Sequence, residues 1–230
     1  MIKNHKFYLD LAFQLAEKNI GHTGLNPSVG CIVVKNSSVI SSGVTSINGR
    51  PHSEFNALNK LKDCSGASLY TTLEPCTHYG KTPPCINIII KKKIKSVFYG
   101  FEDPDIRTFK KAKKILMNKN IRCKQIHLKD YKNFYKSYFL NKKKQIPLIA
   151  AKIAISNDYL TINKKKQWIT NSLSRKIAHL LRSKHDCIIS TSKSINKDNS
   201  LLNCRIEGLN EKKPDLIIID FNLKLKKKLS

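Results

Sequence analysis

The first 140 residues of the chain alternate between helix-like and strand-like spacing of hydrophobic side chains. The N-terminal segment predicts an amphipathic helix. The side chains expected to face inward are Phe7, Leu11, Leu15 and Ala16. Further strands are predicted at 29–35, 38–42, 68–73, 96–101 and 121–127, and further helices at 52–62, 85–93 and 109–119. Strands that alternate with helices in this way predict a layered α/β domain, which we expect to close with a helix ending near residue 140.

A second α/β pattern follows a charged segment. Residues 141–147, NKKKQIP, combine lysines with a proline and are typical of a linker, which predicts domains at 1–143 and 144–230. In the second domain, strands are predicted at 148–155, 186–190 and 216–220, and a helix at 172–184.

The formal net charge of +27 first suggests a nucleic-acid partner. Of the 43 basic residues only six are arginine, however, so 37 are lysine. The planar guanidinium of arginine binds phosphates and base edges better than the lysine ammonium does. The abundant residues Lys, Asn and Ile, moreover, are all encoded by AT-rich codons. The composition therefore favours a solvated lysine-rich surface, and no nucleic-acid partner is expected.

Hydropathy and cysteine usage bear on the compartment. No apolar run approaches the roughly 20 residues that a membrane span needs, and the best candidate, 148–155, is interrupted by Lys152. The N-terminus lacks the apolar region of a signal peptide. The seven cysteines are odd in number and irregularly spaced, which is unlike a disulfide framework. We expect a cytoplasmic protein with reduced thiols and no membrane partner.

One histidine and two cysteines carry the candidate chemistry. His52 precedes a predicted helix, Cys76 follows a predicted strand, and Cys85 begins another helix. These side chains are a standard set of three protein ligands for Zn²⁺, with the fourth position left to water. Glu54, two residues from His52, is placed to take a proton from that water and return it to a leaving amine. The order His-x-Glu, Pro-Cys and a second Cys is that of zinc nucleoside deaminases.

A non-catalytic zinc-binding module is the alternative from another class. Such a module would supply four protein ligands, and Cys64 or His78 is close enough in sequence to be the fourth. The ordered combination of His-x-Glu, strand, Glu-Pro-Cys and helix-starting Cys favours a catalytic site over this module and over chance.

The spacing of the two cysteines departs from the common Pro-Cys-x-x-Cys pattern, because eight residues separate Cys76 from Cys85. The stretch TLEPCTHYGKTPPC (72–85), together with NPSVGCIVVK (26–35) and RPHSEFNAL (50–58), resembles the deaminase domain of the riboflavin-biosynthesis bifunctional deaminase–reductase family. The resemblance covers residues 5 to 140. The nearest alternative function is a deaminase that acts on tRNA or another nucleic acid. Those enzymes have the short Pro-Cys-x-x-Cys spacing, which this chain lacks.

The resemblance implies a cytidine-deaminase-like three-layer α/β/α domain. Its implied reaction is the hydrolytic deamination of 2,5-diamino-6-(5-phosphoribosylamino)pyrimidin-4(3H)-one, a pyrimidine ribosyl phosphate. The implied substrate residues are Asn26, His78, Lys81 and Asp103. His78 and Lys81 lie between two zinc ligands, and a lysine binds phosphate as a point charge. Asp105 stands where the family has Asn, so no contact is carried over to it.

Residues 148–230 resemble the reductase domain of the same family through QWIT (167–170), LLR (180–182) and the stretch 194–205. The resemblance implies an incomplete dihydrofolate-reductase-like α/β domain that uses NADPH. Implied substrate residues are Lys166, Trp168, Arg182, Leu202 and Arg205, and implied cofactor residues are Ala154, Ser194 and Asp198. Trp168 and Leu202 would also suit an ordinary core. Because about 80 residues are few for a dinucleotide-binding domain, we expect deaminase activity without reductase activity from this chain. A homo-oligomer is also anticipated.

Overall fold

The computed structural model describes residues 2–161, 168–209 and 213–226. The chain forms two compact units, Met1–Leu148 and Ile149–Ser230. The N-terminal unit contains helices α1 (Ile2–Glu17), α2 (Ser53–Leu58), α3 (Cys85–Lys91), α4 (Lys111–Met117) and α5 (Lys136–Lys144). Its strands are β1 (Gly30–Lys35), β2 (Ser38–Val44), β3 (Ser68–Leu73), β4 (Ser96–Phe101) and β5 (Arg122–Gln125), and short 3₁₀ turns cover Ile47–Gly49 and Lys129–Tyr131.

The five strands of this unit form one sheet in the order β2-β1-β3-β4-β5. β1 pairs antiparallel with β2 and with β3, whereas β3, β4 and β5 run parallel. Asn36 and Ser37 connect β1 to β2 with φ of 51° and 62°, and this left-handed pair matches the twist of a tight hairpin. The predicted hairpin and the three later strands are therefore confirmed.

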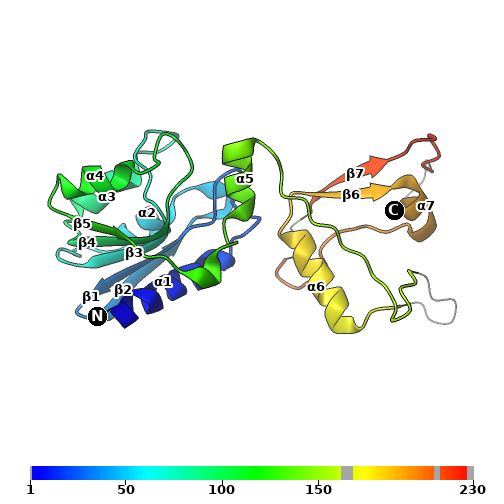
Figure 1. Cartoon of the computed structure of the whole chain (residues 1–230), viewed down its shortest axis with the longest axis horizontal. Helices are drawn as coiled ribbons and strands as arrows, with labels where there is room; N and C mark the ends of the chain where they lie inside the picture. Colours follow the sequence, from blue (N-terminus) through cyan, green and yellow to red (C-terminus); the bar gives the residue numbers. More distant parts are fainter. Residues whose placement is uncertain (1, 162–167, 210–212, 227–230) are drawn as a thin grey trace. The chain divides into compact units, whose positions relative to one another are not determined.

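Helices cover both faces of the sheet and enclose a separate core on each (Figure 1). On one face, side chains of α2, α3 and α4 pack against alternate residues of β1, β3 and β4. On the other face, α1 and aromatic residues of the 128–139 segment pack against the remaining alternate residues. This arrangement is the three-layer α/β/α architecture that was expected.

The buried face of helix α1 matches the prediction in part: Ala16 is buried and Leu11 and Leu15 are partly buried against the core, but Phe7 is not. Phe7 is 56% exposed, whereas Leu9, Ala12, Phe13 and Ala16 are completely buried. The reason is a close approach to β1: a Cβ on Gly30 would lie 1.9 Å from the carbonyl oxygen of Ala12. Only small side chains fit at this contact, so the alanines face the sheet and the larger Phe7 is displaced outward.

Two predicted helices are shorter in the structure. α2 ends at Leu58 rather than near residue 62. α4 begins at Lys111 rather than 109, after Lys110 in the left-handed conformation. α5, in contrast, continues to Lys144 because lysines suit the last turn of a helix, so the first part of the predicted linker is helical.

The C-terminal unit contains α6 (Ser172–Ser183), β6 (Cys187–Thr191), α7 (Ser192–Asp198) and β7 (Asp215–Ile219). β6 and β7 form a parallel pair. The strand predicted at 148–155 is wrong: this segment joins no ladder in the described residues, and Ile149 and Ile153 are 79% and 71% exposed. An isolated extended segment has no partner for its backbone groups, so apolar spacing alone does not make it a strand.

Across the described ranges, no helix combines the length and the apolar character that a membrane crossing requires.

The contact between α1 and β1 makes a stability prediction. Gly30→Ala is expected to lower the free energy of unfolding by about 2 kcal/mol or more, since the new methyl group meets backbone atoms that have no room to move. Urea unfolding measures the difference. Ser38→Ala, at an exposed position of β2, is the control. Equal stability of the two variants would contradict the close approach.

Candidate active site

The candidate active site lies where β3 and β4 end. Cys76 follows β3, His52 is the N-cap residue of α2, and Cys85 is the first residue of α3. Since β3 runs antiparallel to β1 and parallel to β4, the site lies at a change of strand direction, next to the carboxyl ends of two parallel strands. Ligand sites of open α/β sheets are commonly found at such positions.

The three predicted ligands come together. His52 Nδ1 lies 3.6 Å from Cys76 Sγ and 3.4 Å from Cys85 Sγ, and the three donor atoms lie within 4.8 Å of one another. Tetrahedral coordination at ordinary Zn–S and Zn–N bond lengths puts a sulfur and a nitrogen about 3.6 Å apart. The observed spacing therefore fits a zinc ion held by one imidazole and two thiolates.

The protonation state of Cys76 also suits a metal ligand. A hydrogen bond from the Cys85 thiol, aided by His52, lowers the pKa of Cys76 to about 4 despite its burial. The backbone N–H of Cys85 also donates to Cys76 Sγ at 3.1 Å. The thiolate, which is the form that binds metals, is thus favoured near neutral pH.

Neither alternative fourth ligand joins this group. The metal-ligand cluster found among the described residues contains His52, Cys76 and Cys85 alone. Cys64 lies in the core between the sheet and α2–α4, where its thiol contacts a backbone carbonyl oxygen at 3.6 Å. His78 Nδ1 is bonded to Thr108 Oγ1 at 3.1 Å. The described residues therefore leave a fourth coordination position for water.

Glu54 lies beside the ligands, on the first turn of α2. Its side chain is buried, lines the same cavity as His52 and Cys76, and accepts a hydrogen bond of 2.9 Å from the Ser53 hydroxyl. Burial, followed by the charge on Cys76, raises the pKa of this carboxyl. The start of α2 is fixed against β2, because a Cβ on Gly43 would lie 2.3 Å from the Ser53 carbonyl oxygen.

A cavity of about 650 Å³, counted with its open mouth, extends from the metal ligands. Three of the four predicted substrate residues of this unit line it, namely Asn26, His78 and Asp103. The fourth, Lys81, is exposed on the loop between the two cysteines and does not line the cavity.

Each of these three lining side chains is held by a hydrogen bond from another segment. The bonds join Asn26 Nδ2 to the Gly49 carbonyl oxygen at 3.1 Å, His78 Nδ1 to Thr108 Oγ1 at 3.1 Å, and Tyr138 Oη to Asp103 Oδ1 at 2.9 Å. The cavity wall is thus assembled from loops that are distant in sequence.

Sequence reasoning does not assign seven charged or polar side chains of the wall: Thr45, Arg50, Glu74, Asp105, Arg107, Tyr138 and Lys142. A local signal exists for two of them, since Arg50 lies in RPHSE and Glu74 in TLEPC, beside the metal ligands. For Tyr138 and Lys142 there is none, because they reach the site only through the packing of α5.

Glu74 fixes the wall from beneath. Its buried carboxylate accepts hydrogen bonds from the backbone N–H groups of Asp103 at 3.3 Å, Lys110 at 3.0 Å and Ala112 at 3.0 Å. Burial raises the pKa of Glu74, and these three donors oppose that shift. One carboxylate therefore anchors the loop after β4 and the start of α4, just before Cys76.

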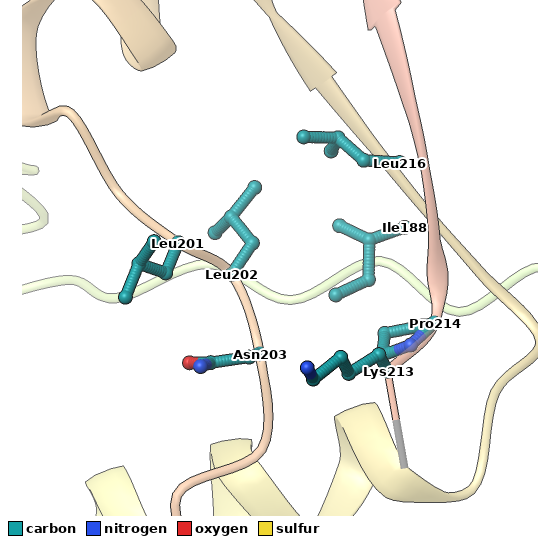
Figure 2. Close-up of a pocket in the computed structure, with 7 residues that line it drawn as sticks. All are labelled: Ile188, Leu201, Leu202, Asn203, Lys213, Pro214 and Leu216. Carbon is teal, nitrogen blue, oxygen red and sulfur yellow. The ribbon is translucent and has the colours of Figure 1, made fainter. Parts of the chain in front are cut away.

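In the C-terminal unit, the predicted residues lie on several separate segments. Of those that the structure describes, only Leu202 lines the pocket found in this unit, where it faces Ile188 of β6 and Leu216 of β7 (Figure 2). Arg182 Nη1 donates to the Asn203 carbonyl oxygen at 3.1 Å, beside that pocket.

The remaining predicted residues that the structure describes in this unit do not line that pocket. Trp168 lies under the Arg175 guanidinium at 4.9 Å, and the Arg205 N–H contacts His179 Nδ1 at 3.3 Å. Ser194 and Asp198 lie on α7, and Ala154 lies on the extended segment before α6. Lys166 lies outside the described residues.

Comparison with protein-family models matches both parts of the chain. Residues 2–101 match the cytidine and deoxycytidylate deaminase zinc-binding region, and residues 147–230 match the RibD C-terminal domain. The N-terminal fold and the three-ligand cluster thus define a zinc-binding domain of the cytidine and deoxycytidylate deaminase class.

Relatives and solved structures agree with this assignment. The riboflavin biosynthesis protein RibD of Aquifex aeolicus is 35% identical over 228 residues, which are 96% of this chain and 63% of the relative. That of Buchnera aphidicola is 36% identical over 92% of this chain and 58% of the relative. RibD of Acinetobacter baumannii superimposes with a TM-score of 0.90 at 28% identity, over 100% of this chain and 67% of that one. The chain belongs to the RibD family of riboflavin-biosynthesis proteins.

A Thermotoga maritima structure described as a diaminohydroxyphosphoribosylaminopyrimidine deaminase/5-amino-6-(5-phosphoribosylamino)uracil reductase is also similar, with a TM-score of 0.88 and 30% identity over 99% of this chain and 66% of that one. The chain spans about 60% of the length of the curated relatives that it matches.

The role of Glu74 is testable by removing one acceptor. Glu74→Gln is expected to lower the free energy of unfolding by about 1–3 kcal/mol. Both oxygens of Glu74 accept backbone N–H groups, so the NH₂ group of the new glutamine would leave at least one of these N–H donors without an acceptor. Chemical denaturation measures this. The control is Glu102→Gln, since Glu102 makes only a long ion pair of 3.9 Å with Lys110. Equal losses in the two variants would contradict the anchoring role.

The ion pairs of Asp105 predict a dependence on pH. Hydrogen bonds from Arg107, followed by those from Lys142, hold the pKa of Asp105 well below its ordinary value. A carboxyl group whose pKa is depressed in the folded protein stabilises the fold at pH values above its pKa in the unfolded chain, which is about 3.9. This contribution to stability is lost as the pH falls below that value towards the pKa of the folded state. The stability difference between wild type and Asp105→Asn should therefore be about 1 kcal/mol smaller at pH 3 than at pH 7. An unchanged difference in denaturation curves at the two pH values would refute the ion pairs.

Proposed function

We propose that the N-terminal unit catalyses the hydrolytic deamination of 2,5-diamino-6-(5-phosphoribosylamino)pyrimidin-4(3H)-one in riboflavin biosynthesis. The observation that carries this proposal is the cluster of His52, Cys76 and Cys85 with the buried carboxylate of Glu54 beside it. The eight-residue spacing of the cysteines and membership of the RibD family support the pyrimidine phosphate as substrate.

His52, Cys76 and Cys85 would hold the zinc ion. When bound, zinc lowers the pKa of a coordinated water molecule enough to supply hydroxide near neutral pH. Glu54 accepts the proton of the attacking water at its carboxylate and transfers it to the ring nitrogen next to the amino-bearing carbon. It then carries a second proton to the departing amino group, which leaves as ammonia while the ring carbon becomes a carbonyl.

The cavity wall orients the substrate in this proposal. Asn26 and Asp103 contact the pyrimidine ring, and each is already held by another segment. His78 and Lys81 lie on the loop between two metal ligands and are assigned to the ribosyl phosphate. Because Lys81 is exposed, it would reach the phosphate from the mouth of the cavity rather than from its wall.

We assign the C-terminal unit to the first part of a reductase domain that uses NADPH to reduce the ribosyl group. The match of residues 147–230 to the RibD C-terminal domain supports this. Substrate contacts are assigned to Lys166, Trp168, Arg182, Leu202 and Arg205, and cofactor contacts to Ala154, Ser194 and Asp198. Ala154 lies on a different segment from Ser194 and Asp198 of α7, and none of the three lines the pocket described above, so the chemistry proposed for this chain is that of the deaminase unit.

The proposed compartment is the cytoplasm. All seven cysteines are free thiols, as expected in a reducing environment. The proposed partner is the small-molecule substrate. A homo-oligomer stays a prediction, which light scattering of the purified protein tests.

The role of Glu54 is testable without loss of the metal. Glu54→Gln should retain zinc and lower kcat for ammonia release by about 10²–10⁴-fold, because the proton carrier is lost while the ligands remain. Metal analysis and an ammonia assay give the two readouts. Glu17→Gln, at the end of α1, is the matched control. Full activity of a zinc-loaded Glu54→Gln protein would overturn the mechanism.

The substrate class is tested by comparing ammonia release from the pyrimidine phosphate, from cytidine and from an adenosine stem-loop. Only the first is expected to react efficiently. Preference for the stem-loop, with steeply salt-dependent binding, would favour the nucleic-acid deaminase instead. A bound zinc with four protein ligands and no reaction would favour the non-catalytic module.

A further inference from the structure

A charged cluster lies in the cavity wall beyond the residues assigned to the reaction. Asp105 accepts two hydrogen bonds from the Arg107 guanidinium, at 2.8 Å from Nε to Oδ1 and 2.6 Å from Nη2 to Oδ2. Lys142 Nζ of α5 donates to Asp105 Oδ2 at 3.2 Å. All three residues line the same cavity as His52 and Cys76.

The three side chains differ in exposure. The Asp105 side chain is 9% exposed, whereas those of Arg107 and Lys142 are 55% and 32% exposed. The carboxylate is thus the covered member, and the two cations are accessible from the cavity mouth. One carboxylate between two cations gives these three side chains a net charge of +1 at neutral pH, before the neighbouring Asp103 carboxyl of the same wall is counted. Such a cluster attracts an anion even though it contains an aspartate.

Hydrogen bonds place this cluster beside the loop that joins the metal ligands. The Thr77 hydroxyl donates to the Arg107 carbonyl oxygen at 2.9 Å, and Thr108 Oγ1 contacts His78 Nδ1 at 3.1 Å. Arg107 and His78 are therefore held on adjacent segments of the wall. Lys81 of the same loop does not line the cavity.

The bonding pattern leaves donors for a ligand. Arg107 uses Nε and Nη2 on Asp105, and its Nη1 makes no hydrogen bond to another described residue. The Lys142 ammonium has three N–H donors and one of them is directed at Asp105. A guanidinium fork and an ammonium held a short distance apart are suited to phosphate oxygens.

We propose that Arg107 and Lys142, oriented by Asp105, bind the phosphate group of the substrate and determine specificity for the phosphorylated compound. The inference rests on the proposed deaminase function and adds two residues to its site. Asp105 acts as a positioning residue: it stands where the resembling family has Asn, and its charge is balanced by the two cations that it orients.

Double variants test the proposal without leaving an unpaired carboxylate. Asp105→Asn removes the charge that needs a partner, and Arg107→Gln or Lys142→Gln is then added to that background. If the cations bind phosphate, each double variant should show a KM about tenfold or more above that of Asp105→Asn, with kcat within about twofold. The dephosphorylated substrate should show no such increase.

Lys143→Gln in the same Asp105→Asn background is the matched control. Lys143 is the next residue on α5, does not line the cavity and lies over the Phe139 ring at 5.6 Å. It should leave the KM for both substrates unchanged. If the double variants also keep the KM of Asp105→Asn, the cations serve only to neutralise Asp105 and the proposal is overturned.

A binding measurement separates this proposal from the proposed reaction. Ribose 5-phosphate is titrated calorimetrically into the zinc-loaded full chain and into the same variants. Binding by wild type that weakens about tenfold in both double variants, but not in the Lys143 control, supports the phosphate site even if no deamination is observed. Equal affinity in all variants overturns the phosphate site even if deamination is observed.

Discussion

The buried carboxylate of Glu74 is the interaction on which the candidate site depends. It follows β3 directly, two residues before Cys76, and accepts three backbone N–H groups from the loop after β4 and the start of α4. A buried charge needs this number of donors to be tolerated, so the loop has little freedom once Glu74 is in place. One residue thereby fixes the metal-ligand segment and the wall that carries Asp103 and Asp105 relative to each other.

Positive charge has two different roles in the protein. Most of the 37 lysines belong to a solvated, lysine-rich surface, and their number does not identify a binding partner. In the cavity wall, by contrast, Arg107 and Lys142 are held by one covered carboxylate beside the loop of His78. A net charge of +27 therefore says less about function than the arrangement of these few cations, because screening by salt weakens exposed charges more than those held close together in a cavity.

The two units differ in how far they organise a site. In the N-terminal unit, five strands with helices on both faces bury two cores, and the cavity residues lie on or next to the elements that these cores hold in place. In the described part of the C-terminal unit, one parallel pair is present and the buried hydrophobic residues are Ile195 and Cys204. Few buried contacts hold its segments together, although Arg182 contacts the segment of Leu202 and Arg205 through the Asn203 carbonyl oxygen.

Sequence by itself determined the α/β order of elements and the hairpin at Asn36. It also predicted that His52, Glu54, Cys76 and Cys85 belong to one candidate site, because each of these features is encoded in a short local pattern. It placed Phe7 of α1 in the core, since apolar spacing does not reveal that β1 approaches α1 closely enough to require alanine. Tertiary structure alone brought Lys142 and Tyr138 of α5 to the wall and paired Asp105 with two cations. Contacts of this kind depend on packing between segments far apart in the chain, and no local pattern records them.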